Sequence, residues 1–97
     1  MRSKLSVSGR NLRKVYEKVA ERDSGLCRIC GQPAADVHHI VFRSHGGKDS
    51  EQNLICLCRT HHEQAHSDEK VWRAKLLEMN ETIYGKIDIS EVKYVWP

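Results

Sequence analysis

The chain has 97 residues, 39% of them hydrophobic and 30% charged, which fits one small folded domain. Its net charge of +3 is uneven, because residues 1–22 carry seven basic and two acidic side chains, a local charge of +5. No apolar run approaches the length of a membrane span, so an integral membrane protein is excluded and a soluble one is expected.

Residues 1–10 contain serine, glycine and basic side chains without periodicity, and are predicted to form a flexible basic arm. A helix is predicted from Asn11, a suitable N-cap, to Ser24-Gly25, because the apolar residues between them fall on one helical stripe. This arm and helix would suit a phosphate backbone. Charge alone more often marks a solvated helix face, so the interpretation depends on the motifs that follow.

Two paired ligand motifs follow the first helix. Cys27 and Cys30 form a CxxC pair before Gly31, which is typical of a zinc knuckle. Cys58 and His61 form a CxxH pair where a predicted strand turns into a helix. Together the four side chains predict a closed structural zinc site, whose binding energy would contribute to folding.

The cysteines could instead form disulfides, act as a redox pair or be small buried hydrophobes. The first ten residues are basic and polar and include no apolar leader, which favours the cytoplasm over secretion. Cytoplasmic CxxC pairs are more often zinc ligands than structural disulfides, and a redox pair needs no histidine-rich partner motif. Cys56 is the odd cysteine; it is a competing ligand in principle, but it lacks a partner at this spacing and is predicted to pack in the core.

Two strands are predicted next. Val37 to Phe42 is β-branched and aromatic, and a polar loop beginning at Gly46-Gly47 separates it from a second apolar strand, Asn53 to Leu57. We expect the two strands to form an antiparallel hairpin. Because successive strand residues face opposite ways, His38 and His39 cannot share a role unless the strand ends or bulges there.

The hydrophobic period becomes helical after the second strand. His62 and His66 are four residues apart, so both imidazoles project from one helix face. A cap at Ser67-Asp68 predicts the start of another helix, which Gly85 ends. Residues 86–97 form a C-terminal extension whose pattern fits either a strand or a helix.

The segments VHHIV, Asn53 and HHEQAH occur in the order His, Asn, His, and CRIC and LCRTH flank them. In these features the chain resembles the zinc-containing branch of the HNH endonucleases, of phage and bacterial type, over residues 12–66. The resemblance implies an α+β fold, a small ββα-metal (His-Me finger) core with zinc knuckles and flanking N- and C-terminal helices. The nuclease domain would span residues 11–85.

The resemblance also implies a role for each histidine of the motif. His38 would bind a divalent metal together with His62 and His66, while His39 would be the general base. Asn53 would orient the base or the loop by hydrogen bonding. A histidine suits proton removal from water near neutral pH, and a divalent cation stabilises charge on the phosphate, leaving a 5′-phosphate and a 3′-hydroxyl.

The chain departs from the commonest pattern of this branch at two positions. His38 stands where aspartate is frequent, and His61 stands where the last zinc ligand is frequently cysteine. An all-imidazole site should accept Mn²⁺, Ni²⁺ or Co²⁺ at least as well as Mg²⁺. Because His61 and His62 are adjacent, either of them could bind zinc.

The sequence therefore predicts a metal-dependent endonuclease acting on DNA in the cytoplasm of a bacterial or phage-infected cell. Basic residues predicted to contact DNA are Arg13, Lys14, Arg43 and Arg59. No base-reading motif is present, so sequence specificity would come from a protein partner or a homodimer. The alternatives are a non-catalytic zinc-stabilised nucleic-acid-binding module and an enzyme that cleaves RNA or branched structures.

Overall fold

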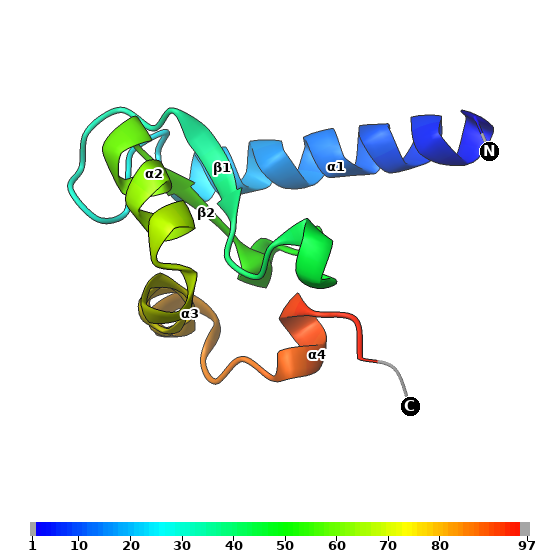
Figure 1. Cartoon of the computed structure of the whole chain (residues 1–97). Coiled ribbons are helices and arrows are strands. Elements are labelled where there is room, and N and C mark those ends of the chain that lie inside the picture. Colours follow the sequence, from blue (N-terminus) through cyan, green and yellow to red (C-terminus); the bar gives the residue numbers. More distant parts are fainter. Residues whose placement is uncertain (1, 96–97) are drawn as a thin grey trace.

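The computed structural model describes the backbone of residues 2–95 and the side chains of residues 12–95. Its elements are α1 (Arg2–Arg22), β1 (Asp36–His39), β2 (Leu54–Leu57), α2 (Arg59–Ser67), α3 (Glu69–Tyr84) and α4 (Ile89–Val92) (Figure 1). The two strands pair as an antiparallel sheet, which confirms the predicted hairpin and small α+β fold. None of the described helices is long and apolar enough to cross a membrane.

Both faces of β2 are covered by helices. Ile55 and Leu57 belong to a core cluster with residues of α2 and α3, whereas Leu54 and Cys56 pack against Val19 of α1. The hairpin is therefore the middle layer, with α1 on one face and α2 and α3 on the other. A strand buried on both faces needs an apolar side chain at every position, which explains the uninterrupted run LICL.

A buried carboxylate joins the end of α1 to β2. Asp23 is 7% exposed and accepts a hydrogen bond of 3.0 Å from the backbone N–H of Cys56. The guanidinium groups of Arg22 and Arg28 lie 2.8 and 3.1 Å from the same carboxylate. A buried charge is tolerated only when it is paired in this way, so the network fixes α1 against the sheet.

The first helix begins earlier than predicted. It starts at Arg2, and Asn11, the expected N-cap, lies inside it. Residues 2–10 contain no proline, and extending an existing helix requires no new nucleus. This part of α1 projects beyond the hairpin (Figure 1). The backbone of residues 2–10 is therefore helical and not the irregular arm that was predicted, while contact of its basic residues with a phosphate backbone stays a prediction.

The first strand ends at His39, earlier than predicted. Beyond it, Asn53 and not a residue of β2 accepts the backbone hydrogen bonds of Ile40 and Val41. The backbone N–H of Ile40 donates to the carbonyl of Asn53 at 2.8 Å, and that of Val41 donates to the Asn53 side-chain Oδ1 at 2.8 Å. Asn53 itself lies in a short 3-10 turn, so β2 begins at Leu54.

The loop between the strands closes on the C-terminal segment. A Cβ at Gly47 would lie 1.8 Å from the carbonyl oxygen of Val41, so only glycine fits there. Gly47 also forms a β-bridge with Lys93, and the Lys48 N–H donates to the Val92 carbonyl at 2.8 Å. The segment that the sequence left unassigned is thus a short helix, α4, followed by chain that packs on the hairpin loop.

Two helix boundaries are confirmed. Asp68 separates α2 from α3, although its side chain makes no capping hydrogen bond. Gly85 follows the last residue of α3 with a φ of 76°, a left-handed value that favours glycine.

Candidate functional site

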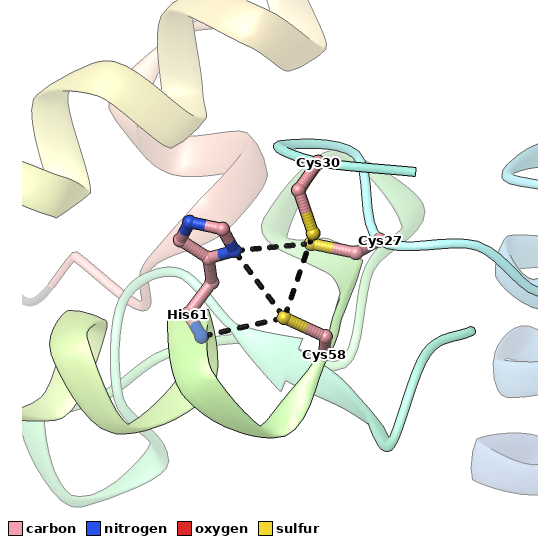
Figure 2. A group of neighbouring side chains, drawn as sticks. All are labelled: Cys27, Cys30, Cys58 and His61. Atoms are coloured by element: carbon pink, nitrogen blue, oxygen red, sulfur yellow. Dashed lines mark hydrogen bonds between the residues drawn. The ribbon is translucent and has the colours of Figure 1, made fainter. Parts of the chain in front are cut away.

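Four potential zinc ligands meet beside the hairpin (Figure 2). Their ligand atoms all lie within 4.8 Å of one another, and they come from the residues Cys27, Cys30, Cys58 and His61. The first two lie in the knuckle before β1, and the last two lie at the start of α2, where Cys58 is the N-cap residue. This cluster could hold a zinc ion.

The spacing of these atoms fits a tetrahedral zinc site. Ligands at about 2.0–2.3 Å from zinc lie about 3.6 Å apart for sulfur and nitrogen and about 3.8 Å apart for two sulfurs. The Nδ1 atom of His61 lies 3.6 Å from the Sγ of Cys27 and 3.3 Å from that of Cys58. The Sγ atoms of Cys30 and Cys58 are 3.7 Å apart.

The environment of Cys27 favours the thiolate that binds metal. Burial opposes ionisation, but backbone N–H groups of Cys58, Cys30 and Ile29 directed at the sulfur lower the pKa of Cys27 to about 6. A turn whose amide hydrogens point at its sulfur atoms is a feature of zinc knuckles, because these donors partly balance thiolate charge.

Cys56 lies apart from this cluster. Its side chain packs on the other face of the sheet, beside Val19. Burial and the nearby Asp23 raise the pKa of the Cys56 thiol to about 11, so the protonated, apolar form predominates. Its position therefore agrees with the predicted packing role.

A second cluster gathers three histidines. The ring nitrogens of His38, His62 and His66 lie within 4.8 Å of one another, and the two Nε2 atoms on α2 are 3.2 Å apart. Two nitrogens bound at about 2.1 Å to one metal ion lie about 3.0–3.4 Å apart, so the set fits a divalent cation. The structure thus groups His61 with the cysteines and His62 with the histidines.

The alternation of β1 separates His38 from its neighbour. His38 pairs with Ile55 and faces α2, whereas His39 pairs with Leu54 and faces α1, where its ring meets Tyr16 edge-on. Because β1 ends at His39, both rings still reach one pocket of about 180 Å³ at the end of the strand. The pocket is also lined by Val37, Phe42, Arg43, His62 and His66.

Burial lowers the pKa of two of the three clustered imidazoles, those of His38 and His62. Desolvation, followed by the nearby His62 and His66, lowers the pKa of His38 to about 3. Desolvation and His66 also lower the pKa of His62. Only a neutral imidazole has a lone pair for a metal, so a lowered pKa suits these two rings to metal binding at neutral pH.

Two carboxylates that the sequence did not single out contact these histidines. Asp36 lies at the start of β1, on the face of His38, and its Oδ2 is 3.4 Å from Nδ1 of His62. Asp49 lies in the loop, and its Oδ1 is 2.7 Å from Nε2 of His39. Neither has a spacing motif; Asp36 could have been noticed only through strand alternation, two residues before His38.

Asn53 organises the loop. It is fully buried; its Oδ1 accepts from Val41, and its Nδ2 donates to the carbonyls of Val41 at 3.1 Å and Lys48 at 2.9 Å. Among the described residues its side chain makes no hydrogen bond to His39. The geometry is that of a side chain holding together the two ends of the loop.

Replacing Asn53 with alanine should lower the free energy of unfolding by about 2–4 kcal/mol, because buried backbone groups would lose their partners. Urea denaturation followed by circular dichroism measures this loss. Replacing Gln52, whose side chain makes no hydrogen bond within the described part, should cost much less. Equal effects of the two substitutions would contradict the role given to the Asn53 amide.

The predicted DNA-contacting residues are exposed, but only one lines the pocket. Arg43 lies at the pocket and is 63% exposed, with its Nε 3.6 Å from Asp49. Arg59, at the start of α2, is 81% exposed. Arg13 and Lys14 are exposed on α1, and Arg13 precedes Tyr16 by one helical turn, so it lies toward the His39 side of the hairpin.

Comparison with known proteins places the chain in a family. Residues 13–90, most of the chain, match the family described as "Protein of unknown function (DUF968)". The chain belongs to this family. No solved structure gives a significant match.

Three curated bacterial proteins are similar to this DUF968 chain. The uncharacterized protein YdfU of Escherichia coli K12 is 34% identical over 65 residues, which cover 64% of this chain and 19% of YdfU. The type IV methyl-directed restriction enzyme EcoKMcrA of the same organism is 28% identical, covering 79% of this chain and 33% of that enzyme. Anaredoxin of Nostoc sp. is 32% identical, covering 59% of this chain and 78% of anaredoxin. The chain thus spans a third or less of the first two relatives.

Proposed function

We propose that the chain is a metal-dependent endonuclease of the HNH type that hydrolyses phosphodiester bonds of DNA. The observation that carries the proposal is the convergence of three imidazoles, His38, His62 and His66, at the pocket that His39 also lines. A purely structural cluster would not need a fourth histidine on the opposite strand face at the same opening.

The three imidazoles would hold one divalent cation. Their ring nitrogens are close enough for a shared ion, and burial favours the neutral form of His38. When bound, a cation supplies positive charge that stabilises the phosphate and its departing oxygen. An all-nitrogen donor set favours Mn²⁺, Ni²⁺ or Co²⁺ at least as much as Mg²⁺.

His39 would act as the general base. Its side chain is 12% exposed and reaches the pocket from the α1 face, opposite the metal-binding imidazoles. From there it would take a proton from the water that attacks phosphorus, leaving a 5′-phosphate and a 3′-hydroxyl. Asn53 would support this geometry through the loop.

The zinc cluster would fix the scaffold around this pocket. Cys58 and His61 lie at the start of α2, the helix that carries His62 and His66. A zinc ion bound to them and to the knuckle before β1 would therefore fix the position of that helix. Such a closed site contributes stability and leaves catalysis to the second metal.

The basic residues would hold the DNA backbone. Arg43 lines the pocket and could contact the phosphate being cleaved, and Arg59, Arg13 and Lys14 would contact flanking phosphates. The similarity to a methyl-directed restriction enzyme supports DNA as the substrate. Specificity for a DNA sequence would then depend on a protein partner or a homodimer.

Supercoiled plasmid incubated with the zinc-loaded protein tests the function. We expect conversion to nicked or linear DNA with Mn²⁺, Ni²⁺, Co²⁺ or Mg²⁺, and none when no divalent cation is added to the zinc-loaded protein. Binding without cleavage under every metal would instead indicate a non-catalytic zinc-stabilised module. Preferential cleavage of RNA or branched DNA in competition would redirect the substrate assignment.

Metal binding by the histidine cluster can be measured independently of DNA cleavage. Replacing His62 with alanine should weaken Mn²⁺ binding, followed by electron paramagnetic resonance, about 100-fold or more, because even an outer partner of a ligand contributes about 10- to 100-fold. His45, an exposed loop histidine that pairs with Glu69, provides the control. Loss of Mn²⁺ affinity in the His45 variant, or retention in the His62 variant, would contradict the assignment.

A further inference from the structure

The carboxylate of Asp49, in the hairpin loop, contacts the ring of the proposed general base. Asp49 places its Oδ1 atom 2.7 Å from Nε2 of His39, the shortest contact that the ring makes in the described part of the chain. The imidazole is 12% exposed and the carboxylate 35% exposed, so water is partly excluded from this hydrogen bond. A charge-assisted bond in such surroundings is stronger than one on an open surface.

The chemistry of the pair decides which nitrogen of His39 carries the proton. An ionised carboxylate has no hydrogen to donate, so a bond of this length requires the hydrogen to lie on Nε2. In the neutral ring the lone pair then lies on Nδ1. We infer that Asp49 is a positioning residue that holds His39 in the Nε2–H tautomer, with Nδ1 as the atom that accepts the proton from water. This inference rests on the proposed function.

The surroundings of Asp49 make this contact a fixed one. The two residues beside it are both bound to the C-terminal segment: the Lys48 N–H donates to Val92 at 2.8 Å, and the Ser50 hydroxyl donates to the Glu91 carbonyl at 2.6 Å. The loop that carries the carboxylate is therefore braced on both sides. Residues 86–95 thereby gain a role, since they hold this loop in place.

The imidazole is confined from other directions as well. Tyr16 of α1 meets the His39 ring edge-on, with ring centroids 6.2 Å apart. The Arg43 guanidinium lies 3.6 Å from the Asp49 oxygen that binds His39 and gives the carboxylate a second partner. A base whose ring is held by packing and whose second nitrogen is bound to a carboxylate keeps both its orientation and its tautomer.

The tautomer is observable directly. Long-range proton–nitrogen correlation spectra of the zinc-loaded protein, at alkaline pH where imidazoles are neutral, distinguish a protonated from an unprotonated ring nitrogen. We expect His39 to show a protonated Nε2 and an unprotonated Nδ1. Asp49→Asn, nearly the same in shape, should give a mixed or reversed assignment, because the amide can also donate to Nε2. Asp49→Glu should restore the wild-type pattern in part.

Kinetics provide the second measurement. Asp49→Asn should lower kcat for plasmid nicking on the order of 100-fold while leaving KM and the affinity for Mn²⁺ unchanged, as expected for loss of an oriented base. Asp49→Glu should recover part of the rate. Glu78→Gln, which removes an exposed carboxylate of α3, serves as the matched control and should behave as wild type.

A wild-type spectrum with the proton on Nδ1 would overturn the inference, as would an unchanged tautomer or an unchanged kcat in Asp49→Asn. A loss of activity that appears entirely in KM would also contradict it. Failure of the wild-type protein to cleave DNA with any metal would overturn the proposed function instead. The spectrum distinguishes the two failures, because it reports the Asp49–His39 contact without requiring catalysis.

Discussion

Replacing His39 with alanine should abolish DNA cleavage while leaving the fold, the zinc content and DNA binding unchanged. A general base contributes about 10²- to 10⁴-fold to the rate, and its removal affects the chemical step rather than substrate binding. The His39 ring lies at the end of β1 and belongs to neither core cluster of the described residues, so its loss should cost little stability. Plasmid nicking, zinc analysis and an electrophoretic mobility assay measure the three properties.

The control for this prediction is His45→Ala, which removes an imidazole of the same loop region that is half exposed. It should retain nicking activity. If the His39 variant still nicked plasmid at the wild-type rate, the base would have to be another group, and the inference about Asp49 would lose its basis.

Replacing Cys30 with serine should remove zinc and unfold the protein together. The apparent binding energy of a structural zinc ion is on the order of 10 kcal/mol, comparable to the whole stability of a small domain. Cys30 is one of the four clustered ligands, and without the ion the two knuckles would be joined only by weak contacts. Far-ultraviolet circular dichroism and measured zinc content should therefore fall in parallel, as they should when a strong chelator is added to the wild type.

Cys56→Ser is the matched control, because this cysteine belongs to the cluster against α1 and not to the zinc set. It should keep a full complement of zinc and lose only a modest part of its stability, since a hydroxyl would replace a buried thiol. A folded, zinc-loaded Cys30 variant would contradict the assignment of the zinc ligands.

Much of the local structure could be predicted from the sequence because it follows from short-range periodicity. The hairpin, the helix carrying His62 and His66, and the end of α3 at Gly85 all appear in the structure. Errors fall at boundaries: α1 begins at Arg2 and β1 ends at His39. The strand ends early because Asn53 takes over the backbone groups that would have continued the ladder, a contact between residues twelve positions apart.

The residues of the candidate site could be predicted from the sequence to about the same extent as the local structure. Residue type and spacing indicated both sets of candidate ligands, and the alternation of side chains along a strand predicted that His38 and His39 face opposite sides of the hairpin. The CxxH spacing favoured His61 as the candidate zinc ligand but did not exclude the adjacent His62. That choice depends on which way each ring points from the first turn of α2, and only the packing of the helix sets it.

The sequence by itself determined which side chains can bind metal or move a proton, since identity and spacing define donor atoms and helix or strand faces. The tertiary structure alone decided which carboxylate meets which imidazole. Asp49 reaches His39 because the loop folds back on itself. Gly47 allows this path, since its backbone packs directly against the carbonyl of Val41, and hydrogen bonds to the C-terminal segment hold the loop in place. No periodic pattern encodes such a contact, because a loop's path is set by the groups that its ends and flanks must satisfy.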